Sequence, residues 1–235
     1  MALAPAPSEW PRAQPFDTGI ITMTSGTTGT PKTILCTYIA YSISISARAS
    51  MVPYACFDLA DAGAAPRQQE REASNVMFVW EAARALCFGH ISVIIADEVL
   101  MDTTLLATFL HEHKVSRVLG TPSLFATFLD TLPSAALPAG GLASLRVWLL
   151  CGEVVPSSLI KSAAAALPHL ALLNDYSSWE GSDTAYAMLS ADRKPGSGFV
   201  DDLSRFAPVG TPPPTVSVAI LDPATLEPVP TGVPG

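Results

Sequence analysis

Short apolar runs alternate with longer amphipathic stretches along most of the chain. The runs GIITM, ISVII, VSRVLG, LRVWLLCG and LALLNDY have the length and apolar content of buried strands. The stretches DTTLLATFLHEHK, PSLFATFLDTL and PSSLIKSAAAALP read as helices, with Asp102 as an N-cap and Pro122 near a helix start. This alternation predicts an α/β fold with a mainly parallel sheet and helices on both faces.

The remaining segments are less regular. Residues 33–52 are apolar almost throughout and predict a helix that follows a glycine-containing loop. Residues 58–74, DLADAGAAPRQQEREAS, are polar and predict a surface loop or a frayed helix. Residues 76–90 predict a helix that ends near Gly89.

Composition divides the chain into three parts. Residues 1–15 are rich in Ala and Pro and predict a tail, and residues 16–206 hold the alternating strands and helices. From residue 207 to residue 235 proline is dense, and VSVAIL (216–221) predicts a strand. We therefore expect 207–235 to begin a separate β element.

Charge and hydropathy exclude several classes of protein. Hydrophobic residues make up 49% of the 235 residues, which is enough for a core of ordinary size. The formal net charge of -8 argues against a nucleic-acid partner. No apolar run is long enough to span a membrane, and the four cysteines lack metal or redox spacing. We expect a cytoplasmic protein with reduced thiols and no membrane partner.

The stretch TSGTTGTPK, from Thr24 to Lys32, combines hydroxyl groups, two glycines and one lysine. Backbone N–H groups of such a loop suit a phosphate, and the hydroxyls and Lys32 add donors and charge. The P-loop pattern G-x-x-x-x-G-K-[ST] nearly fits from Gly26. Pro31 stands at its last glycine, however, and proline has no N–H and a fixed φ. The P-loop reading is therefore disfavoured.

The same nine residues resemble the phosphate loop of the adenylate-forming, or AMP-binding, enzymes. That superfamily contains acyl-CoA synthetases, luciferases and the adenylation domains of nonribosomal peptide synthetases, and its loop reads [ST]-S-G-[ST]-T-G-x-P-K. Further stretches resemble its motifs in the same order: FVWE (78–81), TPSLF, CGEVVP, NDYSSWE (174–180), and PVGTP with the passage into a small β-barrel. The resemblance covers 17–235 and is strongest to stand-alone, synthetase-like adenylation proteins.

The resemblance implies an ATP-dependent ligase that forms an acyl or aminoacyl adenylate with release of pyrophosphate. ATP and Mg²⁺ would be its cofactors, a small-molecule carboxylate its substrate, and CoA, a carrier-protein thiol or an amine its acceptor. Lys32 and Glu180 match catalytic positions, and Glu180 also matches the glutamate linked to magnesium. The positions implied to contact ATP are Thr24, Ser25, Gly26, Thr27, Thr28, Gly29, Lys32, Gly152, Glu153, Asn174, Tyr176 and Ser178.

The resemblance also implies a pocket for the acid. Val76 stands where amino-acid-activating domains carry an Asp, so it offers no charge for an α-ammonium and disfavours α-amino acids. Asp175 and Asp183 either meet an amine elsewhere on the substrate, such as a β-amino group, or face solvent. The pocket positions are Val76, Met77, Trp80, Leu119, Cys151, Asp175 and Asp183.

Two departures from the family limit these expectations. Trp179 stands where the family has Thr or Ser, so either Ser178 serves instead or ATP binds badly. The ribose aspartate of Y-R-T-G-D and the lysine-bearing small domain have no match in the chain. We expect a middle fragment of a ligase that is inactive alone. The alternative is a non-catalytic relic of the same fold that binds nucleotide or a partner.

Overall fold

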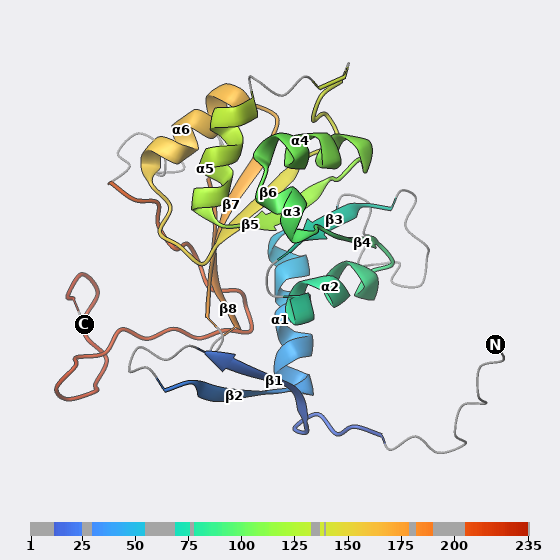
Figure 1. Ribbon diagram of the computed structural model, residues 1–235. Helices are drawn as coiled ribbons and strands as arrows, with labels where there is room; N and C mark the ends of the chain where they lie inside the picture. The colour runs from blue at the N-terminus through green and yellow to red at the C-terminus, as the bar shows by residue number, and fades with distance from the viewer. Residues whose placement is uncertain are drawn as a thin grey trace.

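The computed structural model describes residues 12–24, 30–54, 69–75, 78–132, 137–138, 140–178, 182–189 and 205–234. Within these residues, its main element is a six-stranded sheet in the order β4-β3-β5-β6-β7-β8 (Figure 1). All neighbouring pairs are parallel except β7 and β8, so the mainly parallel sheet is confirmed. The strands are β3 (Arg71–Ser74), β4 (Ile91–Ile94), β5 (Arg117–Gly120), β6 (Val147–Cys151), β7 (Ala171–Ser178) and β8 (Ser182–Met188).

Helices cover both faces of this sheet (Figure 1). On one face, α4, α5 and α6 pack on an apolar core in which the Trp148 ring lies 4.5 Å from the Phe125 ring and 5.1 Å from the Phe128 ring, between centroids. On the other face lie α1 and α2, where Leu149 and Leu173 contact residues at the end of α1. The helices are α1 (Tyr38–Met51), α2 (Phe78–Cys87), α3 (Asp97–Leu100), α4 (Thr103–Glu112), α5 (Pro122–Thr131) and α6 (Ser157–Ala166).

Local sequence signals set several helix starts. Asp102 caps α4 by accepting hydrogen bonds from the N–H groups of Thr104 and Leu105, at 2.9 and 3.2 Å. Pro122 begins α5, where the helix needs no N–H donor, and Thr121 caps that helix. No helix among the described residues is long and apolar enough to cross a membrane.

The helix expected over residues 33–52 was wrong at its start. Residues 32–37 form strand β2 (Lys32–Thr37), which pairs antiparallel with β1 (Thr18–Thr24) in a separate two-stranded sheet. The β-branched residues Thr33 and Ile34 favour a strand, and Thr37 caps α1. The segment between β1 and β2 therefore connects two strands of a hairpin and does not lead directly into a helix.

Two other expectations also differ from the structure. Residues 71–74, expected in a polar loop, form β3 between β4 and β5. Its Glu72 is buried and accepts a hydrogen bond from the Tyr54 hydroxyl, a partner that local polarity does not reveal. The strand expected over 216–221 is absent from the described structure, where Leu221 makes an isolated bridge with Pro228.

Gly210 provides a test of how the segment after residue 205 packs. Its φ is +96°, and an added Cβ would collide with the backbone carbonyl of Tyr186. Gly232 has a similar φ of +88° but has open space around it. We expect Gly210→Ala to lower the free energy of unfolding by roughly 1–3 kcal/mol more than Gly232→Ala does, because only the first overpacks. Chemical denaturation of both variants measures this, and equal losses would contradict the close contact.

Candidate functional site

Several predicted site residues gather at the carboxyl ends of neighbouring parallel strands. Leu119 lies near the end of β5, Cys151 ends β6, and Asp175 is the register partner of Cys151 on β7. All three are buried. The carboxyl edge of an open α/β sheet is where such folds bind ligands, because the following loops diverge there. The structure thus brings together candidates that are far apart in the sequence.

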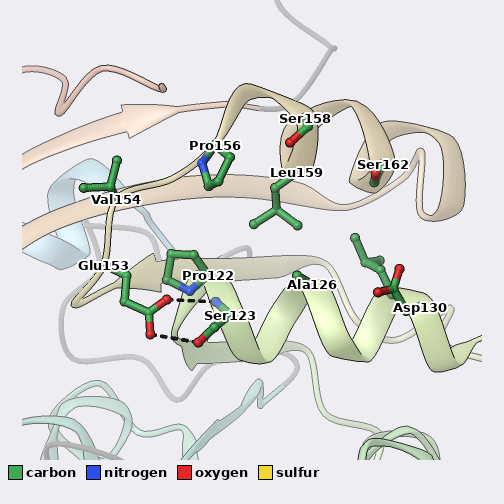
Figure 2. A pocket seen from close by; sticks show the side chains of 11 residues that line it. Pro122, Ser123, Ala126, Asp130, Glu153, Val154, Pro156, Ser158, Leu159 and Ser162 are labelled. Atoms are coloured by element: carbon green, nitrogen blue, oxygen red, sulfur yellow. Dashed lines mark hydrogen bonds between the residues drawn. The ribbon is translucent and has the colours of Figure 1, made fainter. Parts of the chain in front are cut away.

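The turn from β6 to α6 carries Gly152 and Glu153. Gly152 has a φ of +82°, a backbone conformation that favours glycine. The Glu153 carboxylate accepts hydrogen bonds from the N–H and hydroxyl groups of Ser123 at the start of α5, at 3.0 and 2.8 Å (Figure 2). These contacts lie at one end of a groove of about 310 Å³ between α5 and α6. The carboxylate of Glu153 is therefore engaged, and any contact with adenine would come from its backbone.

Strand β7 presents the next group of candidates. The buried Asn174 side chain donates a hydrogen bond to the Pro208 carbonyl at 2.9 Å. Tyr176 is 54% exposed, and Ser178 is exposed. An exposed tyrosine ring on a rigid strand can stack on a planar ligand.

The hairpin holds the ends of the phosphate-loop motif. Thr24 and Lys32 are register partners at the end of the β1–β2 pair, and the Lys32 side chain is exposed. Trp80 lies on α2, but its side chain lies outside the described residues. The other candidates outside the described residues are Ser25, Gly26, Thr27, Thr28, Gly29, Val76, Met77 and Glu180, and Trp179 lies outside them as well.

Asp175 and Asp183 do not face solvent. Both are buried, and both lie against the guanidinium of Arg48 on α1, at 2.7 and 3.0 Å. Arg48 also forms an ion pair with Glu81 of α2 at 2.6 Å and donates a hydrogen bond to the Tyr186 hydroxyl at 3.2 Å. Arg48 itself is 3% exposed. One guanidinium therefore joins α1 to α2, β7 and β8.

A second arginine completes this group, which we call the Arg48 cluster. Arg84 of α2 lies 3.3 Å from Asp183 and 3.4 Å from Glu81, and it donates to the Ser44 carbonyl of α1 at 3.1 Å. The cluster therefore contains three carboxyl groups and two guanidinium groups. A carboxyl oxygen of Asp175, Oδ1, is buried without a hydrogen-bond partner. The cluster has one more carboxyl group than guanidinium groups, and Asp175 is the carboxyl group with an unsatisfied buried oxygen.

The two aspartates of the cluster titrate differently. Burial raises the pKa of Asp175 to about 7, against the opposing charge of Arg48 and with a further rise from Asp183 and Glu81. Burial also acts to raise the pKa of Asp183, but Arg48 and Arg84 outweigh it and hold that pKa below its usual range. Burial raises the pKa of the neighbouring Cys151 to about 12, so its thiol stays protonated at neutral pH.

Sequence reasoning missed the basic half of this cluster. Arg48 is the one charged residue of α1, YIAYSISISARASM. A single arginine among apolar and small residues of a helix is a signal for a buried charge, because buried arginines need carboxylate partners.

Among the described residues, no group of three or more His, Cys, Asp or Glu side chains is placed to hold a metal ion.

The chain belongs to the AMP-binding enzyme family. The family profile described as AMP-binding enzyme matches residues 3–235. This match agrees with the phosphate-loop sequence and with the sheet that carries the other motifs.

Named relatives and solved structures agree with that assignment. The glycine betaine reductase ATRR of Emericella nidulans is 33% identical over 192 residues, which is 81% of this chain and 13% of the relative. The phosphinothricin tripeptide synthetase PhsB of Streptomyces viridochromogenes is 35% identical over 157 residues, 67% of this chain and 12% of the relative. This chain thus spans about an eighth of either relative.

One solved structure matches the fold over nearly the whole of this chain. The structure of McyG A-PCP complexed with phenylalanyl-adenylate has a TM-score of 0.77 and 19% identity to this chain. The match covers 97% of this chain and 35% of the McyG chain. The α/β fold predicted from the sequence is therefore that of adenylation domains.

The raised pKa of Asp175 predicts how stability depends on pH. Between about pH 4 and pH 7 the folded protein holds a proton that the unfolded chain has lost, so this group lowers stability as pH rises. We expect Asp175→Asn to remove that loss, which amounts to at most about 2–3 kcal/mol between pH 5 and pH 7. Urea denaturation of both proteins across this pH range measures the difference.

The comparison between the two proteins isolates Asp175. His90 acts in the opposite direction, because burial lowers its pKa and its contribution to stability therefore rises with pH. His90 is present in both proteins, so its effect cancels in the difference. Parallel stability curves for Asp175→Asn and the unsubstituted protein would contradict a raised pKa at Asp175.

Proposed function

We propose that this chain supplies the nucleotide- and acid-binding surface of an ATP-dependent ligase that activates a carboxylate. The observation that carries the proposal is the loop from Thr24 to Lys32, which connects β1 and β2 in a chain of the AMP-binding family. In the proposed reaction a carboxylate oxygen attacks the α-phosphorus of ATP. The bond between the α-phosphorus and the oxygen that bridges it to the β-phosphorus breaks, and pyrophosphate leaves with that electron pair.

The proposed roles follow the chemistry of each group. Amide and hydroxyl groups of residues 24–29, with Lys32, bind the β- and γ-phosphates. Tyr176 stacks on adenine, beside the backbone of residues 152–153 and Asn174. Mg²⁺ is usually held by phosphates, water and one or two carboxylates, and we assign Glu180 as that carboxylate. The ion would neutralise phosphate charge.

The acid itself is proposed from what the pocket positions offer. Val76 cannot pair with an α-ammonium, and Asp175 and Asp183 are already paired with Arg48. An α-ammonium would therefore lose its hydration without gaining a partner. We infer an acid that has no α-ammonium N–H groups: a plain acid, one with a distant amine, or one with a fully methylated nitrogen. Glycine betaine, named in the relative ATRR, belongs to the last class. The proposed acceptor is a thiol of CoA or of a carrier protein, or an amine.

The phosphate loop generates a binding test. Lys32→Ala removes one charge-assisted contact, worth about 1.5–3 kcal/mol, so ATP affinity should fall roughly 10- to 100-fold. AMP lacks the β- and γ-phosphates, and its affinity should hardly change. Isothermal titration calorimetry with Mg²⁺ measures both affinities. Lys161→Ala, which removes an exposed lysine of α6, is the matched control and should change neither.

The outcomes of this titration separate the alternatives. Equal weakening of ATP and AMP by Lys32→Ala would mean that the residue acts through the fold and not through phosphate. Failure of the unsubstituted chain to bind ATP at millimolar concentration would overturn the proposed function. It would favour a non-catalytic relic, to which the indole at position 179 also points, because Trp179 cannot supply the hydroxyl expected there.

Turnover gives a second prediction. Residues 1–235 contain no Y-R-T-G-D motif and no match to the lysine-bearing small domain. We therefore expect this polypeptide alone to show no carboxylate-dependent exchange between ATP and pyrophosphate, measured with labelled pyrophosphate and a panel of acids. Robust exchange with any acid would show that the groups needed for adenylation lie within these residues.

A further inference from the structure

The residues assigned to ATP lie on two separate sheets. Thr24 and Lys32 are opposite each other on the two-stranded sheet of β1 and β2. Asn174 and Tyr176 lie on β7 of the six-stranded sheet. The triphosphate and the adenine belong to one ligand, so both ends bind at once only if the two sheets keep a fixed separation and angle. Some element must therefore hold one sheet against the other.

Helix α1 is firmly joined to the first of these sheets. Thr37 is both the last residue of β2 and the N-cap of α1. The next residue, Tyr38, donates its backbone N–H to the Asp17 carbonyl at 3.1 Å. The Tyr38 ring lies so close to Gly19 of β1 that an added Cβ would be 3.1 Å from it. These contacts hold the start of α1 against the hairpin.

Arg48 joins the same helix to the second sheet. It lies eleven residues after Thr37 in the sequence, which is about 16 Å along an α-helix. Its guanidinium contacts Asp175 of β7 and Asp183 of β8 at 2.7 and 3.0 Å. Asp175 directly precedes Tyr176, so a shift of this contact also shifts the candidate adenine residue. A planar guanidinium with several partners tolerates few other arrangements, unlike an apolar contact.

We propose that Arg48 is a positioning residue for ATP. It fixes the phosphate-binding hairpin relative to the adenine-binding strand, through α1 and the two aspartates. The proposal rests on the proposed function, because that function assigns the two ends of ATP to the two sheets. Replacing a buried ion pair by apolar groups often costs little net stability, so a role in fixing one arrangement accounts better for a cluster of this size.

The test compares ATP with its two separate halves. Lysine keeps the charge of Arg48 but cannot contact Asp175, Asp183, Glu81 and Tyr186 at once. In Arg48→Lys, ATP affinity should fall about 3- to 30-fold, the range of typical coupling energies. The affinities for adenosine and for inorganic tripolyphosphate should change less than about twofold, because each half uses one sheet. Calorimetric titration of the three ligands measures this selectivity.

Arg117→Lys is the matched control. Arg117 is an equally buried arginine on the same face of the sheet. It donates to the carbonyls of Val52, the C-cap of α1, and Pro53, and it lies 3.9 Å from Glu70 and 4.0 Å from Glu72, but among the described residues it makes no ion pair with β7 or β8. Its replacement should not weaken ATP selectively. An unchanged ATP affinity in Arg48→Lys, or equal losses for ATP, adenosine and tripolyphosphate, would overturn the proposal. If Arg48→Lys does not fold, Asp183→Asn keeps the guanidinium and removes one of the carboxylate charges paired with it, and a smaller loss confined to ATP is expected.

Hydrogen exchange separates failure of this inference from failure of the proposed function. Absence of ATP binding to the unsubstituted chain would overturn the function. Exchange by mass spectrometry tests the link without any nucleotide. Arg48→Lys should speed amide exchange in α1 and β8 by about 3- to 30-fold and leave β5 and β6 unchanged. An equal increase in the exchange rates of all four elements, or no change in the exchange rates of α1, would overturn the link that Arg48 is proposed to make.

Discussion

The buried guanidinium of Arg48 constrains how the rest of the molecule can be assembled. A charge that is 3% exposed is tolerated only when carboxylates surround it, and here they come from α2, β7 and β8. These elements are separated by more than a hundred residues of sequence between Glu81 and Asp183. The hydrophobic effect is non-directional, whereas charge-assisted hydrogen bonds require defined distances and angles. The Arg48 cluster therefore sets where α1 lies on the sheet.

The two faces of the six-stranded sheet are stabilised in different ways. Under α4, α5 and α6 the core is apolar, and Trp148 fills it together with two phenylalanine rings. Under α1 and α2 the Arg48 cluster lies toward one end of the strands, and Arg117 lies further back, over the Tyr54 ring at 4.4 Å. Arg117 also donates to the Val52 carbonyl just after α1. One face thus holds the larger apolar core. On the other face, ion pairs between arginines and carboxylates fix how α1 is oriented on the sheet.

This division explains which elements could be predicted from the sequence. Strands β4, β5 and β6 and helices α4, α5 and α6 pack mainly through apolar residues, so hydrophobic patterns, Asp102 and Pro122 locate them. Strand β3 has the sequence REAS, and its buried Glu72 depends on Tyr54, which is distant in the sequence. The hairpin strand β2 was mistaken for helix because its pairing with β1 is a tertiary feature. Motifs located Asp175 and Asp183, and the lone arginine of an apolar helix signals a buried charge, but its pairing with these two aspartates depends on where α1 lies.

The same reasoning explains why the candidate site is divided between two structural units. A phosphate-binding hairpin needs free backbone N–H groups and cannot also be a central strand, whose N–H groups pair within the sheet. In the proposed site a planar base instead needs an exposed aromatic ring on a rigid strand, and Tyr176 of β7 is 54% exposed. Separate units satisfy these opposed requirements, but they then need a connection that resists sliding. Helix α1 lies between them, and Arg48, the one charged residue of that helix, contacts Asp175 and Asp183 of the larger sheet and does not face solvent.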